Sequence, residues 1–181
     1  MDEWASEEGT SSGRPQTAKA SLRPPQPRYF PEVSTEVFAG EYGFELALQE
    51  LQTDRPNMYM YSQILNRLYC RKGKPCPIPM KVSSSPPPGS IIRAVTTYES
   101  RVAAAIKSPL EGRTRVDPPD HPIQVEGNQH VQYFSDKETL RDSVTITYER
   151  PEVGSAYTTI LYKFIHTRSP VLIVITLQSL K

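Results

Sequence analysis

One stretch of the chain concentrates side chains that could bind phosphate groups. Residues 55–81 contain no acidic residue, and three tyrosines lie among six basic residues, which are Arg55, Arg67, Arg71, Lys72, Lys74 and Lys81. A basic segment attracts a nucleic-acid backbone, because each phosphate that it neutralises releases condensed counterions. Residues 31–54, in contrast, carry six acidic residues and no basic ones. The alternative interpretation is therefore a solvated loop face whose charge is balanced by the acidic segment before it.

The cysteines and histidines form no recognisable metal or catalytic pattern. Cys70 and Cys76 have five residues between them, and His121, His130 and His166 are scattered. A structural zinc site needs about four sulfur or imidazole ligands. A nucleophilic pair of Cys70 with a histidine would need an activating neighbour that the sequence does not show. We expect Cys70 to pack as a small buried residue, each histidine to lie on the surface, and the protein to be neither an enzyme nor a binder of a small-molecule substrate.

The composition favours β-strands. The 181 residues include 18 prolines, nearly twice the usual ~5%, and an interior proline costs a helix about 3 kcal/mol. Ten tyrosines and many β-branched residues suit strands. The longest apolar run, residues 171–177, is far shorter than the ~20 residues of a membrane span. The chain start lacks the regions of a signal peptide, and two cysteines suit a reducing, intracellular compartment.

Short strand candidates follow one another from about residue 33. They are residues 42–48, 58–61, 78–82, 91–98, 123–126, 131–134, 144–148, 158–164 and 171–177, and residues 101–107 are the one good helical segment. This spacing predicts an all-β antiparallel sandwich with Greek-key connections. Residues 1–30 are polar and proline-rich, which is typical of a disordered terminus. Trp4, among acidic residues, leaves an acidic-hydrophobic activation segment as the alternative for that terminus.

Several strings occur in an order that resembles one family of transcription factors. They are residues 40–44, 61–62 with 65–70, 74–78, 85–90, 93–95, 125–128, 139–144, 148–155 and 170–177. Together they resemble the DNA-binding core of the cellular tumour antigen (p53) tumour-suppressor family, over about residues 33–177. The resemblance implies an immunoglobulin-like β-sandwich over residues 31–181 that holds loops against DNA. It also implies a regulator of the cell cycle and apoptosis in the nucleus, with the cytoplasm as a second location.

The family reads DNA through three elements, and the resemblance assigns a residue to two of them. Arg55 lies near the position of a lysine that enters the major groove, where arginine could contact guanine. Its alternatives are a phosphate contact and a solvated side chain. Arg168 is the only arginine near the position of the family's minor-groove arginine. The third element, a strand and a helix, would follow Lys181 and is not in this sequence, and neither is a tetramerisation helix.

The resemblance also implies a zinc site, and its ligand positions are altered here. Ser108, Glu111 and His166 fall opposite three of the four ligands, and the fourth has no counterpart. Zinc is therefore the cofactor of the family, while we expect no metal in this chain.

Two functions follow from these observations. The first is a sequence-specific DNA-binding transcription factor whose reading of DNA is impaired in this shortened chain, so that binding is weak or nonspecific. The alternative is an interaction protein that does not bind DNA, or an interfering short form, which retains only the sandwich and binds related family chains. We expect the apolar strand at residues 171–177 to lie at an uncovered sheet edge, through which chains would associate.

Overall fold

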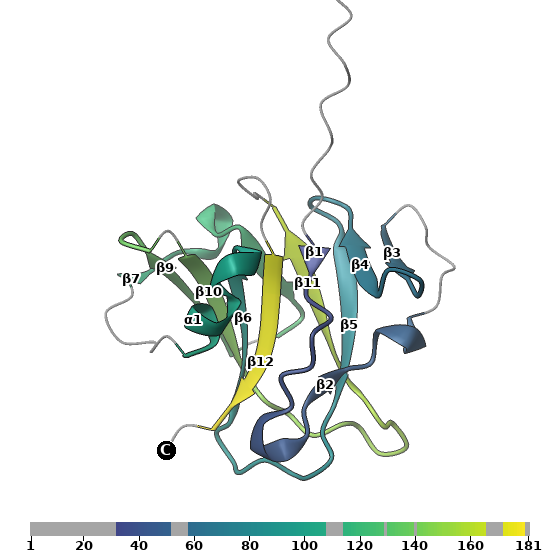
Figure 1. Ribbon diagram of the computed structural model, residues 1–181. Helices are drawn as coiled ribbons and strands as arrows, with labels where there is room; N and C mark the ends of the chain where they lie inside the picture. The colour runs from purple at the N-terminus through teal and green to yellow at the C-terminus, as the bar shows by residue number, and fades with distance from the viewer. Residues whose placement is uncertain are drawn as a thin grey trace, which may run out of the picture.

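Two β-sheets pack face to face in the computed structural model, which describes residues 32–51, 58–107, 114–128, 130–139, 141–165 and 172–179 (Figure 1). The eight-stranded sheet has the order β3 (Tyr59–Ser62), β4 (Arg67–Cys70), β1 (Glu32–Val33), β12 (Leu172–Gln178), β6 (Ile91–Thr97), β10 (Arg141–Thr147), β9 (Val131–Asp136) and β7 (Thr114–Arg115). The four-stranded sheet has the order β2 (Glu45–Leu46), β5 (Pro75–Lys81), β11 (Thr158–Phe164) and β8 (Ile123–Glu126). Neighbouring strands are antiparallel, except that β1 and β12 are parallel. The predicted all-β sandwich is confirmed.

Helices are few and short in the described residues. They are α1 (Val102–Lys107) and the 3-10 helices η1 (Gly40–Tyr42), η2 (Leu48–Glu50), η3 (Glu99–Arg101) and η4 (Pro118–Asp120). No helix in this part of the chain is long and apolar enough to cross a membrane.

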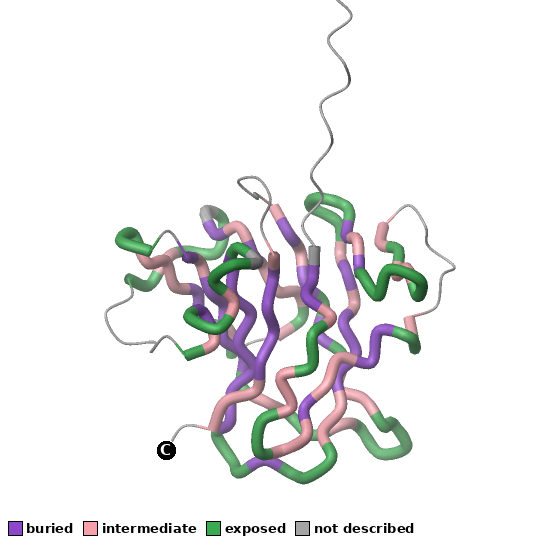
Figure 2. The backbone as a smooth tube through the Cα atoms, in the orientation of Figure 1, coloured by how far each residue is buried: buried purple, intermediate pink, exposed green. Residues whose placement is uncertain are grey.

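A single apolar layer fills the space between the sheets. Ile78 on β5 and Tyr162 on β11 come from one sheet, and Ile92 on β6 and Ile173 on β12 come from the other; all four are fully buried. Figure 2 shows buried residues along the strands and exposed ones mainly in the connections. Burying one such side chain contributes about 1.5–3 kcal/mol, so this layer holds the sheets together.

Alternate prolines shape one border of the four-stranded sheet. Pro75, Pro77 and Pro79 all lie in β5, which begins three residues before the predicted strand at residues 78–82. The carbonyl of Pro79 accepts a hydrogen bond from the N–H of Ala47, next to β2, at 2.8 Å. Backbone groups alternate in direction along a strand, so the three prolines face the β2 side and leave every N–H toward β11 intact. Proline fits a strand where its missing N–H is not needed, and β2 pairs with β5 only at Met80 and Lys81.

The predicted strand at residues 42–48 is largely wrong. It contains the end of η1, two residues of β2 and the start of η2. Gly43 has a φ of 61°, which ends η1 in the left-handed region that suits glycine. Phe44 and Leu48 are buried even though they lie in or beside these turns. The alternation of apolar residues therefore does not mark a continuous strand here. The sequence patterns also missed β1, β4 and β7.

The expected open edge at residues 171–177 is also wrong for the described residues. β12 pairs with β6 along its whole length and with β1 at Leu172 and Ile173. The N–H of Ser34, directly after β1, donates to the carbonyl of Ile173 at 2.7 Å. Residues 173–176 are at most 5% exposed. A buried strand between two neighbours offers no template, so the expectation that chains associate through it loses its basis.

One histidine is buried, contrary to the expectation for all three. Nδ1 of His121 lies 2.6 Å from the carbonyl oxygen of Ile123, and Nε2 lies 3.0 Å from that of Phe134. Ile123 belongs to β8 and Phe134 to β9, so the imidazole connects the two sheets. The ring also contacts Tyr133, at 5.0 Å between centroids. His130 is exposed, as expected, and His166 lies outside the described residues.

We predict that His121→Ala lowers the free energy of unfolding by about 1–3 kcal/mol, because it leaves buried backbone groups without partners. Urea unfolding followed by circular dichroism measures the loss. His130→Ala, at an exposed position, is the control and should change stability by less than about 0.5 kcal/mol. Equal losses in the two variants would show that the buried imidazole does not stabilise the contact between the sheets.

We predict the opposite effect for a buried tyrosine. The hydroxyl of Tyr162 has no hydrogen-bond partner among the described residues, and burial raises the pKa of this side chain. Tyr162→Phe removes that unsatisfied group and should raise the free energy of unfolding by about 1–3 kcal/mol. The matched control is Tyr133→Phe, because the Tyr133 hydroxyl accepts a hydrogen bond from the N–H of Val125 at 3.1 Å. That control should be destabilised; a loss of stability in Tyr162→Phe as well would contradict the prediction.

Candidate nucleic-acid interface

The fold divides the basic segment between the two ends of the sandwich. Arg71, Lys72 and Lys74 are exposed in the turn between β4 and β5, whereas Lys81 lies at the other end of β5. A seven-residue strand is about 20 Å long. Lys81 forms an ion pair with Glu45, which raises the pKa of the lysine. The candidate phosphate-binding surface is therefore the turn at residues 71–74, and we call it the basic turn.

Backbone hydrogen bonds fix the basic turn against its neighbours. The N–H of Arg71 donates to the carbonyl of Met58, and the N–H of Gly73 donates to that of Phe164, both at 2.8 Å. Gly73 has a φ of 68°, a conformation that residues with a Cβ rarely adopt. The turn is thus held between the start of the β3–β4 hairpin and the end of β11, while its charged side chains remain in solvent.

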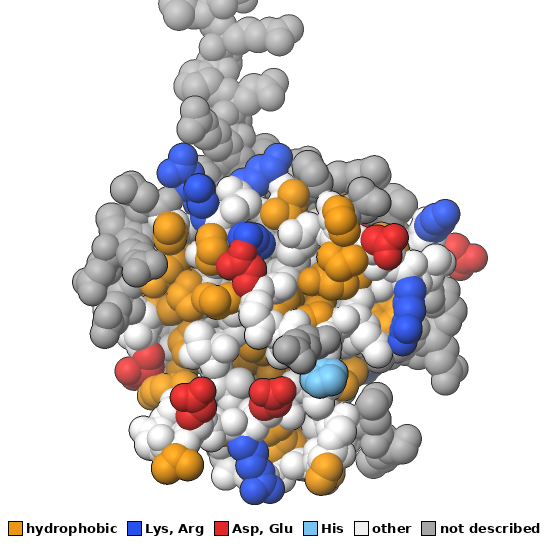
Figure 3. Space-filling model, turned by 180° about the vertical axis from the view of Figure 1, so that it is seen from behind, with side chains coloured by type: hydrophobic (Ala, Val, Ile, Leu, Met, Phe, Trp, Pro, Cys, Tyr) orange, Lys and Arg blue, Asp and Glu red, His pale blue; other side chains and the backbone are white. Residues whose placement is uncertain are grey.

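Other connections reach the same end of the sandwich. β6 ends at Thr97, which pairs with Leu172 at the start of β12, and η3 follows directly with exposed Arg101. Viewed from behind, Figure 3 shows several Lys and Arg side chains gathered toward the upper end of the molecule. No local sequence pattern brings Arg101 to this end of the sandwich, because its position depends on the pairing of β6 with β12.

The two residues that the resemblance assigned to DNA reading, Arg55 and Arg168, lie outside the described residues. The segment with Arg55 ends at Met58, whose carbonyl accepts the hydrogen bond from Arg71. The segment with Arg168 joins the end of β11 to the start of β12. Both segments therefore connect to the end of the sandwich that carries the basic turn.

The tyrosines of the basic segment support the fold. Tyr59 and Tyr61 on β3 pack against the hydrophobic core, and Tyr69 on β4 is half-buried. The hydroxyl of Tyr61 donates to Oδ1 of Asn66 at 2.6 Å. These rings stabilise the β3–β4 hairpin, so their interleaving with basic residues does not by itself indicate a stacking platform for bases.

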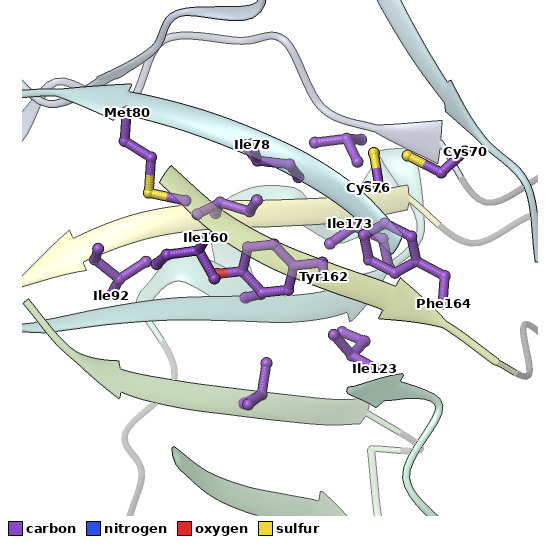
Figure 4. Close-up of a cluster of buried hydrophobic side chains, with 14 of the residues drawn as sticks. Cys70, Cys76, Ile78, Met80, Ile92, Ile123, Ile160, Tyr162, Phe164 and Ile173 are labelled. Atoms are coloured by element: carbon purple, nitrogen blue, oxygen red, sulfur yellow. The ribbon is translucent and has the colours of Figure 1, made fainter. Parts of the chain in front are cut away.

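The two cysteines lie in the core and point toward each other (Figure 4). A hydrogen bond with Cys76 and burial both raise the pKa of the Cys70 thiol. A thiol of this kind stays protonated, whereas zinc ligands and nucleophiles are thiolates. The expectation that Cys70 packs as a small buried residue is confirmed.

No zinc site can be built from the described residues, which contain no group of three His, Cys, Asp or Glu side chains suited to a metal ion. Ser108, Glu111 and His166, the altered ligand positions, lie outside these residues. The donor set at those positions is one hydroxyl, one carboxylate and one imidazole, which does not fit the cysteine-rich pattern of a structural zinc site.

Comparison with known proteins decides the family. The profile of the P53 DNA-binding domain matches residues 34–179, which include β2 to β12. The chain belongs to the p53 family. The family is one of transcription factors with a zinc-binding DNA-binding domain, so the resemblance inferred from the sequence is confirmed.

Similar p53 proteins occur in fish and amphibians. The cellular tumor antigen p53 of Oncorhynchus mykiss is 35% identical over 91% of this chain and 46% of its own length. That of Xenopus laevis is 36% identical over 81% of this chain and 45% of its own length. That of Ictalurus punctatus is 37% identical over 86% of this chain and 46% of its own length. The chain thus spans about half the length of the curated relatives that it matches.

Proposed function

We propose that this chain is a DNA-binding transcription factor of the p53 family that acts in the nucleus, with the cytoplasm as a second location. The observation that carries the proposal is the basic turn, which the fold holds at the end of the sandwich to which the segments with Arg55 and Arg168 connect. In this proposal residues 31–181 form the DNA-binding sandwich, and residues 1–30 are a disordered terminus. Control of the cell cycle and apoptosis would follow from the family.

The described basic residues suit phosphates better than bases. Arg71, Lys72 and Lys74 are three neighbouring cations in one turn, and contacts to phosphates position a protein on DNA without reading its sequence. Base reading would depend on Arg55 and Arg168. We therefore propose that binding is weak, sensitive to salt and largely independent of sequence, which is the impaired form of the family function.

One observation favours the alternative of an interaction protein. The β3–β4 hairpin exposes three large apolar side chains, Met60, Ile64 and Leu65, and its turn is separated from the basic turn by the length of β4. Phosphate binding has no use for such side chains, whereas a protein partner, including a related family chain, would bury them. A DNA titration separates the two functions, because an interaction protein would show no affinity for DNA even at low salt.

Removing charge from the basic turn should weaken DNA binding without changing its specificity. We predict that Lys72→Ala/Lys74→Ala lowers affinity equally for a family response element and a scrambled duplex. The slope of log affinity against log salt should fall by about 2, close to one unit for each lost phosphate contact. Fluorescence anisotropy at several salt concentrations measures both quantities. Lys81→Ala is the matched control and should leave binding unchanged; an equal loss in the control would place the DNA elsewhere.

If binding is largely independent of sequence, Arg55 contacts a phosphate and not a base, and Arg55→Ala should weaken binding to both duplexes alike. A base contact would instead cost about 1–3 kcal/mol on the response element alone. The same titration distinguishes the two results. A contrary result would be a preference of the unmodified chain for the response element by ~10³-fold or more at physiological salt. That result would show that the chain recognises the DNA sequence, and the proposal of impaired recognition would be wrong.

We propose that this chain holds no structural zinc, although the family does. Cys70 and Cys76 are buried in the core, and the altered ligand positions offer no thiolate. Elemental analysis after dialysis against a mild chelator should find no zinc, and the chelator should not shift the midpoint of urea unfolding. One tightly held zinc per chain would contradict this proposal, because structural sites of that kind contribute directly to folding.

A further inference from the structure

One border of the eight-stranded sheet is formed by β3, which pairs with β4 alone among the described strands (Figure 1). Residues 57–66, which include this strand and the turn after it, contain no charged residue and no proline. Natural proteins usually protect a border strand with charges, with proline or by making the strand very short, because its backbone groups can otherwise pair with another chain. β3 has four residues and lacks these protections.

The other sheet borders of the described residues are protected. β2 and β7 have two residues each, and each of them carries a charged residue, Glu45 in β2 and Arg115 in β7. β8 has four residues, but the N–H of Val125 within it donates to the hydroxyl of Tyr133 at 3.1 Å. Among the four borders in this part of the chain, β3 is therefore the exception.

The register of the hairpin shows which backbone groups of β3 point outward. The N–H of Arg71 donates to the carbonyl of Met58 at 2.8 Å, and the antiparallel pairing continues from there along β3 and β4. Because hydrogen-bonded pairs alternate along antiparallel strands, Met60 and Ser62 bond to β4. The N–H and C=O of Tyr61 therefore point away from β4, toward the border of the sheet.

Apolar side chains gather at the same border. Ile64 is 97% exposed, Leu65 60% and Met60 53%, and Met58 is partly exposed. Single exposed apolar residues are normal on a protein surface, whereas a cluster of this kind marks a site of interaction. The border thus offers a partner both backbone hydrogen bonds and apolar contacts.

Hydrogen bonds hold the hairpin in one conformation. The N–H of Leu65 donates to the hydroxyl of Ser62 at 3.3 Å, and Oδ1 of Asn66 accepts a hydrogen bond from the hydroxyl of Tyr61 at 2.6 Å. The ring of Tyr61 also packs against the hydrophobic core. A border that is already ordered loses little conformational entropy when it binds a partner.

We propose that two copies of this chain associate through β3, by antiparallel pairing that joins their eight-stranded sheets. The N–H of Tyr61 in each copy donates to the C=O of Tyr61 in the other. Met60 then lies opposite Ser62 of the second copy, and Ile64 lies beside Met58 of the second copy. A second copy is the occupant that fits, because a two-fold axis at Tyr61 makes this border complementary to itself and buries the apolar side chains of both copies. The proposal does not depend on DNA binding.

The basic residues of the hairpin oppose this association only weakly. Arg67 belongs to β4, so the two β3 strands separate the Arg67 backbones of the two copies by about 14 Å at the usual strand spacing. That distance exceeds the screening length of about 8 Å at physiological salt. Residues 58–65 are far fewer than the roughly 20–30 residues a side of a stable interface, so we expect a weak dimer with a dissociation constant on the order of 100 µM.

Analytical ultracentrifugation of the full chain tests the association. The average mass should rise from monomer toward dimer between about 10 µM and 1 mM protein. The dimer should be more stable at high salt, because salt screens the repulsion between basic residues and leaves apolar contacts intact. A chain that stays monomeric over this range would overturn the proposal.

Hydrogen exchange of single amides, followed by NMR, tests which strand is buried in the dimer. Exchange of the Tyr61 amide should slow as the protein concentration rises. Exchange of the Met60 amide, which is bonded to β4 in each copy, should change little. Association without any change at Tyr61 would overturn the proposed pairing.

A charge on the border should prevent pairing. Met60→Lys changes an exposed residue, so the variant should fold, and it should remain monomeric up to the highest concentration. The matched control is Val153→Lys, which adds the same charge at another exposed apolar residue, in the connection between β10 and β11, and should associate like the unmodified chain. Far-UV circular dichroism verifies that both variants fold. Dimers of Met60→Lys, or an equal loss of association in the control, would contradict the proposal.

A mixture of two variants tests the register. Ser62→Asp keeps an oxygen that can accept the N–H of Leu65, and its carboxylate would lie opposite the new ammonium group of a Met60→Lys chain. Each variant alone should associate at least severalfold more weakly than the unmodified chain, whereas an equimolar mixture should form dimers, because opposite charges on facing residues attract. A mixture that stays monomeric would overturn the pairing. None of these measurements uses DNA, so their failure would leave the proposed function standing.

Discussion

The burial of one apolar layer between two sheets is the interaction on which the remaining structure depends. Ile78 and Tyr162 from the four-stranded sheet meet Ile92 and Ile173 from the eight-stranded sheet, and the strands that carry them keep a fixed register. Because the strands are antiparallel, successive connections lie at opposite ends of the sandwich. A basic segment that is continuous in sequence is thereby divided, with Lys81 at one end and the basic turn at the other.

Sheet borders impose a second constraint, since every buried backbone group needs a partner. In β5 the prolines remove N–H groups only from the side away from β11, so the ladder between these strands stays intact. At β12 the two residues of β1 pair with one end of the strand, and the chain after β1 continues with a hydrogen bond from Ser34. The short β1 strand therefore has two roles: it covers one end of β12 and it joins that border of β12 to β4.

The sequence patterns located strands that pair regularly along their length. They did not locate features that depend on contacts between distant parts of the chain. Residues 123–126 and 158–164 were predicted with the bounds that β8 and β11 have. β1 is too short for any periodicity, so the neighbour of β12 could not be foreseen. The burial of His121 depends on Phe134 in the other sheet, a contact that no local pattern contains. In the candidate site, the structure brings Arg71, Lys72 and Lys74 together in one turn but puts Lys81 at the other end of β5, because sequence distance does not show which end of a strand a residue occupies.

β4 joins two exposed features of different chemistry. The turn of the β3–β4 hairpin, with exposed Ile64 and Leu65, precedes β4 and the basic turn follows it, and β1 and β3 pair with its two sides. A ligand that offers only phosphates can satisfy the basic turn but leaves Ile64 and Leu65 in water. A protein partner with an apolar side chain would bury them, and each apolar contact adds free energy that salt does not screen. The two ends of one strand therefore favour different ligands.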